Sequence, residues 1–146
     1  MRYRDVVISV KGLLGTGEDG DDIELVTSGK YAYSPEKTEL FYWESELTGM
    51  DGTKTTFEIS PEAVMLTREG TVAMQMIYEE GRKNYFAYGT PYGSATMGLE
   101  TLEIQNSLGE SGGHLRIKYI LSFMESAAMR AAVNIHVRPV KEETGK

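Results

Sequence analysis

The chain has 146 residues, a formal net charge of −7 and no cysteine. This length is typical of a domain that folds without a disulfide or metal staple. We expect a single domain over residues 1–146, with 141–146 as a frayed tail. The absence of cysteine excludes thiolate catalysis and cysteine-bound zinc or iron–sulfur centres. Lys and Arg are scattered, and phosphate affinity depends on clustered basic side chains, so nucleic acid is not expected as a partner.

The first ten residues, MRYRDVVISV, carry only a short apolar run with no small-residue cleavage site after it. They predict no signal peptide. The longest apolar stretches fall far below the roughly 20 residues of a membrane helix, so no membrane partner is expected. A cysteine-free chain suits a reducing compartment, and we expect a cytoplasmic protein.

Segments that alternate apolar and polar residues dominate the chain in order. They cover residues 5–14, 23–33, 38–46, 53–60, 63–70, 71–81, 83–89, 98–108, 114–123 and 133–140. A period of two over such short runs, separated by glycine-bearing turns, is typical of β-strands. About eight to ten evenly spaced strands predict an all-β protein, either a sandwich or a barrel.

Three segments of this pattern have local features of their own. In residues 98–108 the alternation places Leu102 and Ile104 on the face opposite Thr101 and Glu103. Ser60-Pro61 could start one helical turn at most. The Ala-rich stretch 124–132, MESAAMRAA, has helical propensity, and either a wide hairpin or a short helix fits its length.

Four fragments, taken in order and spacing, resemble the YwiB-like family of uncharacterised bacterial proteins. They are YWESELTGMDGTKTTFEI at 42–59, MLTREG at 65–70, TPYGSATMGLET at 90–101 and GGHLRIKYIL at 112–121. The resemblance covers nearly the whole chain and implies a single antiparallel up-and-down barrel of the calycin type, similar to lipocalins. It implies no function, and the stretch 124–132 departs from the tighter link expected before the last strand.

The residues considered for a ligand site come from several predicted strands. Tyr42, Glu44 and Glu46 share one strand face in the alternating pattern, and Arg68 and Gln75 lie on nearby predicted strands. In a barrel of about eight strands, such polar groups could orient one small ligand. The favoured interpretation is nevertheless structural, a cross-strand pair of Glu44 or Glu46 with Arg68. Burial of that pair would favour function, because a buried ion pair is costly to keep.

The remaining sequence features give weaker evidence for a ligand or metal site. Tyr88, Tyr92 and Tyr119 could line a cavity, although tyrosine is also common in strands. The acidic run at 18–22 does not match a calcium loop, and GTPYGSATMG at 89–98 has no phosphate-binding lysine. His114 and His136 have no metal-ligand spacing along the chain and are expected at the surface. We therefore predict no catalytic residue, no metal and no cofactor.

Three functions remain open. The first is binding of a small apolar or amphipathic ligand inside the barrel, which follows from the lipocalin-like resemblance alone. The second is an interaction or scaffold protein with a side-chain-filled barrel that works through its surface or as a homodimer. The third is an enzyme, with Glu44, Glu46 and Arg68 as the first residues to test.

Overall fold

The computed structural model describes residues 2–12, 24–46, 50–123 and 127–140. Ten strands make up its secondary structure: β1 Arg4–Lys11, β2 Glu24–Ala32, β3 Thr38–Trp43, β4 Lys54–Ile59, β5 Val64–Glu69, β6 Met74–Tyr78, β7 Lys83–Thr90, β8 Gly93–Asn106, β9 Gly113–Phe123 and β10 Ala127–Pro139. The predicted acidic turn at 18–22 and the tail at 141–146 lie outside the described residues. So do positions 124–126.

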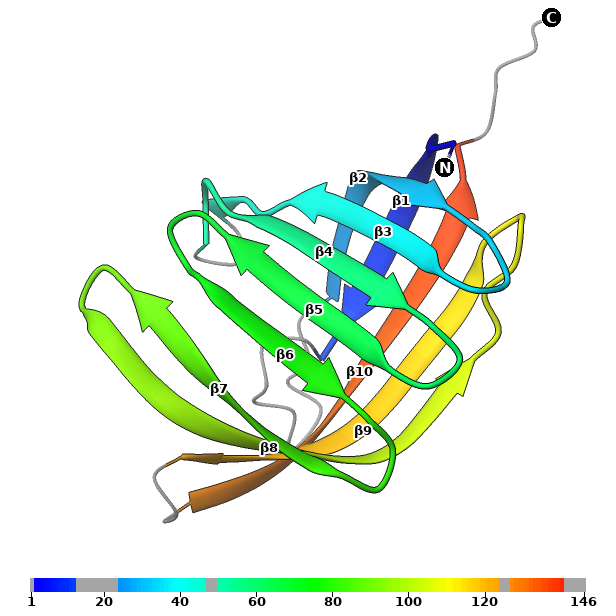
Figure 1. Cartoon of the computed structure of the whole chain (residues 1–146). Helices are drawn as coiled ribbons and strands as arrows, with labels where there is room; N and C mark the ends of the chain where they lie inside the picture. Colours follow the sequence, from blue (N-terminus) through cyan, green and yellow to red (C-terminus); the bar gives the residue numbers. More distant parts are fainter. Residues whose placement is uncertain (1, 13–23, 47–49, 124–126, 141–146) are drawn as a thin grey trace, which may run out of the picture.

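All ten strands belong to one antiparallel sheet, in which each strand lies beside its neighbours in the chain. The first and last strands also pair, with Val6 opposite Pro139 and Lys11 opposite Asn134, so the sheet curls into a nearly closed barrel (Figure 1). The predicted all-β, up-and-down barrel is therefore confirmed, and the sandwich alternative is excluded. Pairing of β1 with β10 hides strand edges that would otherwise be exposed.

The barrel is held least tightly at the seam between β6 and β7. There the two strands meet through one isolated bridge, in which Ala73 and Gly89 exchange backbone hydrogen bonds of 2.9 and 3.0 Å. Further along the seam, the side-chain amide of Asn84 donates to the Ile77 carbonyl at 3.0 Å. A side chain thus stands in for a backbone ladder near the β6–β7 turn, and the isolated bridge joins the two strands at the other end of the seam.

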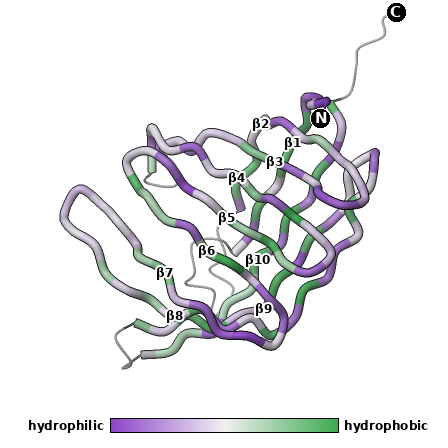
Figure 2. The backbone as a smooth tube through the Cα atoms, in the orientation of Figure 1, coloured by the Kyte–Doolittle hydropathy of each residue, from purple (hydrophilic) through white to green (hydrophobic). Residues whose placement is uncertain are grey.

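Alternation along each strand builds the core inside the barrel. Figure 2 shows apolar and polar positions following one another along the strands. The apolar inward positions form one cluster, whose fully buried members include Ile8, Leu40, Phe57, Leu66, Leu99, Ile117 and Val133. Burying such side chains contributes about 1.5–3 kcal/mol each, so the inner face fixes the register of the sheet.

Two local predictions are settled by the structure. The part of the Ala-rich stretch that is described, from Ala127 onward, is extended and pairs with β9, which excludes the helix there. The predicted faces of β8 are wrong at one point, because Leu102 and Ile104 do not share a face. Leu102 is 40% exposed, whereas Ile104 packs against the core on the same side as the fully buried Thr101. A β-bulge between Thr101 and Glu103 inserts Leu102 as an extra residue and shifts the alternation.

The two ends of the barrel differ. The turns β2–β3, β4–β5, β6–β7 and β8–β9 gather at one end, where the Tyr31 hydroxyl donates to the Gly109 carbonyl at 2.6 Å. Burial raises the pKa of Tyr31 to about 12, so this hydroxyl stays protonated and keeps the contact. The connections β3–β4, β5–β6 and β7–β8 lie at the opposite end, which we call the β3–β4 end.

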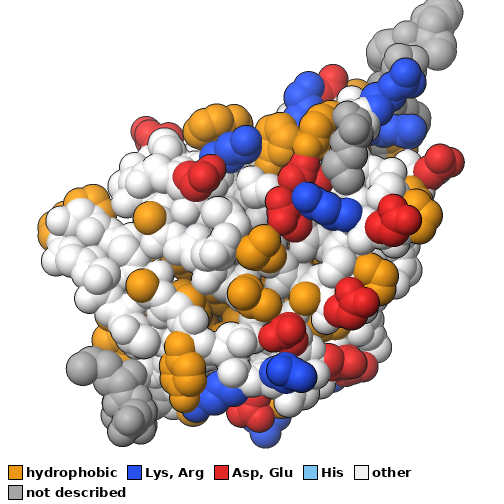
Figure 3. Space-filling view, viewed as in Figure 1, with side chains coloured by type: hydrophobic (Ala, Val, Ile, Leu, Met, Phe, Trp, Pro, Cys, Tyr) orange, Lys and Arg blue, Asp and Glu red, His pale blue; other side chains and the backbone are white. Residues whose placement is uncertain are grey.

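The outer surface carries charges of both signs. On the face shown in Figure 3, Lys and Arg are interspersed with Asp and Glu. The described residues contain no helix long and apolar enough to cross a membrane.

Candidate functional site

A buried ion pair lies inside the barrel near the β3–β4 end. Arg68 on β5 and Glu44, just beyond β3, approach to 3.6 Å between Nε and Oε2, and their side chains are 5% and 0% exposed. Thr55 on β4 joins them, because its hydroxyl donates to Glu44 Oε2 at 2.5 Å and accepts from Arg68 Nε at 3.2 Å. Charges this deeply buried are retained only when they are paired.

The strand pattern explains why these polar groups point inward. Along β5 the buried positions are Val64, Leu66 and Arg68, so the arginine occupies a place that alternation gives to the core. Opposite it in the register stands Thr55. The Glu44 amide donates to the Thr53 carbonyl at 2.8 Å, which continues the β3–β4 ladder by one step and keeps Glu44 on the inner face.

Beyond the ion pair, the polar side chains continue across the barrel. Tyr78 on β6 packs edge-on against Tyr119 on β9, with ring centroids 5.3 Å apart. Tyr119 in turn stands opposite Thr101 on β8. We call the whole set the interior cluster, and it comprises Tyr42, Glu44, Thr55, Arg68, Tyr78, Thr101 and Tyr119, all of them buried.

Four polar atoms of the interior cluster are buried without a well-formed hydrogen bond. They are the hydroxyl oxygens of Tyr42, Tyr78 and Thr101 and the Nη2 nitrogen of Arg68. These are all the atoms of this kind among the described residues. Leaving a buried polar group unsatisfied costs about 1–3 kcal/mol, so four in one place call for an explanation.

The tyrosines of the interior cluster stay neutral. Burial raises the pKa of Tyr42 far above its usual value, and the neighbouring Glu44 carboxylate raises it further. Burial also raises the pKa of Tyr78 and, less strongly, that of Tyr119, although the charge of Arg68 lowers both. All three therefore present O–H groups that can donate a hydrogen bond at neutral pH.

The structure brings together four of the eight residues considered from the sequence, namely Tyr42, Glu44, Arg68 and Tyr119, whereas Tyr92 is 98% exposed. Tyr88 lies at the margin, half-buried against the apolar core. Glu46 and Gln75 are exposed and lie outside the interior cluster. Gln75 alternates with inward-facing methionines on β6, and Glu46 lies beyond the end of β3.

Three members of the interior cluster were not predicted. Alternation places Tyr78 on the same inward face as Met76, and Thr55 on the same inward face as Phe57. Both could have been predicted as cluster members, because they are the inward positions that carry a hydroxyl group. Thr101 could not have been predicted in this way, because the bulge at Leu102 shifts the alternation along β8.

The two histidines form a separate pair on the outer surface. His114 and His136 stand opposite each other on β9 and β10, and their rings stack with centroids 4.1 Å apart. Sequence spacing hides this proximity, because the strand register creates it. Burial and the charge of His114 lower the pKa of His136. Across the described residues, no group of three or more His, Cys, Asp or Glu side chains could hold a metal ion.

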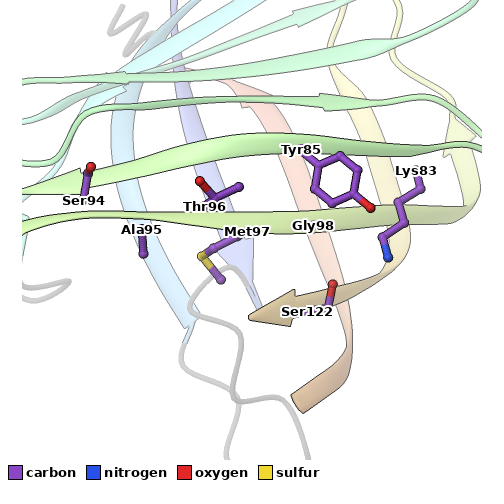
Figure 4. A pocket seen from close by; sticks show the side chains of 8 residues that line it. All are labelled: Lys83, Tyr85, Ser94, Ala95, Thr96, Met97, Gly98 and Ser122. Atoms are coloured by element: carbon purple, nitrogen blue, oxygen red, sulfur yellow. The ribbon is translucent and has the colours of Figure 1, made fainter. Parts of the chain in front are cut away.

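A surface pocket of about 660 Å³ runs along the β7–β8 hairpin (Figure 4). Its lining residues are Lys83, Tyr85, Ser94, Ala95, Thr96, Met97, Gly98 and Ser122. The absence of a side chain at Gly98 makes room, since a Cβ there would lie 2.7 Å from the Ser122 hydroxyl. None of the lining residues carries a buried polar atom without a partner, so the interior cluster is the stronger candidate site.

Comparisons with known proteins support the family resemblance. A family model described as Domain of unknown function (DUF1934) matches residues 8–135. The crystal structure of ywiB protein from Bacillus subtilis is similar, with a TM-score of 0.76 and 22% sequence identity over 95% of this chain and 94% of that chain. At this identity the likeness concerns the fold. No curated protein matches the chain. The chain belongs to the DUF1934 family, a family of unknown function.

Proposed function

We propose that this protein binds a small amphipathic molecule inside its barrel, with the polar end of the molecule at the interior cluster. The observation that carries the proposal is the set of four buried polar atoms without partners beside a buried ion pair. In folded proteins nearly all such atoms bond to protein, ordered water or ligand. Concentration of them at one place in an otherwise apolar interior is typical of a binding site.

The surroundings of the interior cluster suit the apolar part of such a ligand. Met74, Met76, Phe86, Tyr88 and Met97 lie on the inner faces of β6, β7 and β8, beside the seam where the sheet is held least tightly. Methionine side chains adapt readily to the shape of a ligand. The interior of a barrel widens as the number of strands rises, and a barrel of eight strands already has room for either packed side chains or one small ligand.

We further propose that this barrel is of the calycin type and lipocalin-like, as the resemblance to the YwiB-like family implies. The proposal also includes a cytoplasmic, bacterial setting, supported by the cysteine-free composition and by a similar structure from a bacterium. The homodimer stays a prediction.

Native mass spectrometry of the protein purified from its own host tests the proposal. We expect an additional non-covalent mass on the wild-type chain that is lost on collisional activation. The double variant Tyr42→Phe/Tyr78→Phe removes two unpartnered hydroxyls and keeps both rings, so the additional mass should fall sharply. Tyr85→Phe is the matched control, because Tyr85 is 68% exposed on the outside of the barrel.

A bare chain mass in all three proteins would contradict ligand binding and would favour the scaffold alternative. The same spectra report whether the chain is a monomer or a homodimer.

A further inference from the structure

Arg68 offers only part of its guanidinium to a ligand. Its Nε side faces Glu44 and Thr55, at 3.6 and 3.2 Å. Its Nη1 lies 4.0 Å from the Met74 sulfur, which is a weak acceptor. Its Nη2 is buried with no partner. The open end of the arginine is therefore a charged N–H donor.

The other unpartnered atoms are hydroxyl groups. Tyr42 and Tyr78 are both close enough to Arg68 to be affected by its charge, Tyr42 also lies beside the Glu44 carboxylate, and both tyrosines keep their protons. Thr101 adds a third hydroxyl next to Tyr119. A ligand group surrounded by these atoms meets mostly donors, so it must supply acceptor oxygen atoms.

The charge balance of the interior cluster restricts the acceptor further. The guanidinium charge is already balanced by the Glu44 carboxylate, and no other Lys, Arg, Asp or Glu side chain is buried among the described residues. A second carboxylate would leave one uncompensated negative charge in the barrel, and an ammonium group would face Arg68. Either case places an ion in the barrel without a counter-charge, which is strongly unfavourable because the ion loses its hydration.

We infer that the polar end of the ligand is an uncharged carbonyl-type acceptor, such as a primary amide, ketone or ester, held by Arg68 Nη2 and the hydroxyls of Tyr42 and Tyr78. The inference rests on the proposed function and specifies the ligand class of the same site.

Three probes with the same alkyl chain separate the possibilities: decanamide, decanoate and decylammonium. In titration calorimetry at neutral pH, decanamide should bind at least about tenfold more tightly than either charged probe, a difference of about 1.4 kcal/mol. Equal or tighter binding of decanoate would overturn the inference and leave the proposed function intact.

Glu44→Gln supplies the sharper comparison, because it removes the balancing charge and keeps the side-chain size. In this variant decanoate should overtake decanamide. Glu46→Gln is the matched control, since Glu46 lies two residues away and is exposed, and it should keep the wild-type order. An unchanged order in Glu44→Gln would contradict the charge argument.

If Glu44→Gln does not fold, Tyr42→Phe serves instead. It should weaken decanamide binding about fivefold, as expected for one lost hydrogen bond, whereas Tyr85→Phe should not. The chemical class of any co-purifying mass gives an independent outcome. An amide, ketone or ester supports the inference, and a carboxylic acid or amine overturns it. If no mass co-purifies and no probe binds, the proposed function fails together with the inference.

Discussion

Removing one partner of the Glu44–Arg68 pair should be far more damaging than removing both. Their side chains are 0% and 5% exposed, so Arg68→Met or Glu44→Gln alone leaves a buried charge without its counter-charge. Such a change typically costs 3–5 kcal/mol. The double variant leaves no charge in the interior and nearly preserves the volume. We expect it to be within about 1 kcal/mol of wild type or more stable by roughly 1–4 kcal/mol.

Urea unfolding followed by far-ultraviolet circular dichroism measures these free energies for the wild type and the three variants. The exposed pair Lys118–Glu103 provides a matched control, because its charged atoms are 3.7 Å apart but its side chains are 47% and 42% exposed. In the corresponding variants of Lys118 and Glu103, each single substitution should lower the free energy of unfolding by at most about 1 kcal/mol. The control separates the effect of burial from the effect of distance.

One result would refute the reasoning. If the double variant loses as much as the two single variants combined, the two side chains stabilise the fold independently, and the losses in the single variants do not come from an uncompensated charge. The buried charges would then need no ligand to explain them. A double variant that is as stable as wild type but no longer retains a ligand would show that the pair serves binding.

Two further predictions concern the seam and the histidine pair. A Cβ built at Gly89 lies 3.9 Å from the Ala73 Cβ, which is within disulfide range. The oxidised form of the double variant Ala73→Cys/Gly89→Cys should therefore be more stable than its reduced form by about 3 kcal/mol in urea unfolding. Equal stabilities of the two forms would mean that the Ala73–Gly89 bridge does not hold the seam. Because the pKa of His136 is lowered in the folded chain, the unfolded chain binds more protons than the folded chain just below pH 6.5. The free energy of unfolding should therefore rise with pH across that window, and His136→Gln should remove the rise. A rise that survives the substitution would assign it to another group.

The sequence was most informative where one rule governed a whole segment. Residues 114–119 alternate without interruption, and β9 follows the same alternation in its inward Leu115, Ile117 and Tyr119. Alternation could not choose between a sandwich and a barrel. That choice depends on whether the first and last strands pair, and the β1–β10 register involves residues more than a hundred positions apart.

The interior cluster was predictable only in part, for local geometric reasons. Arg68 stands out because a charge occupies an apolar position of the alternating pattern. Thr101 was hidden by a single inserted residue, Leu102, which a period of two cannot detect. The stacking of His114 on His136 was hidden too, because it depends on the register of two strands rather than on spacing along the chain.

The central claim is that the interior cluster is a ligand site, and a high-resolution crystal structure of the protein purified from its own host tests it most directly. The account predicts electron density for an organic molecule whose acceptor oxygen lies within hydrogen-bond distance of Arg68 Nη2 and of the hydroxyls of Tyr42 and Tyr78. Ordered water alone at these three atoms, with the barrel filled by side chains, would contradict it.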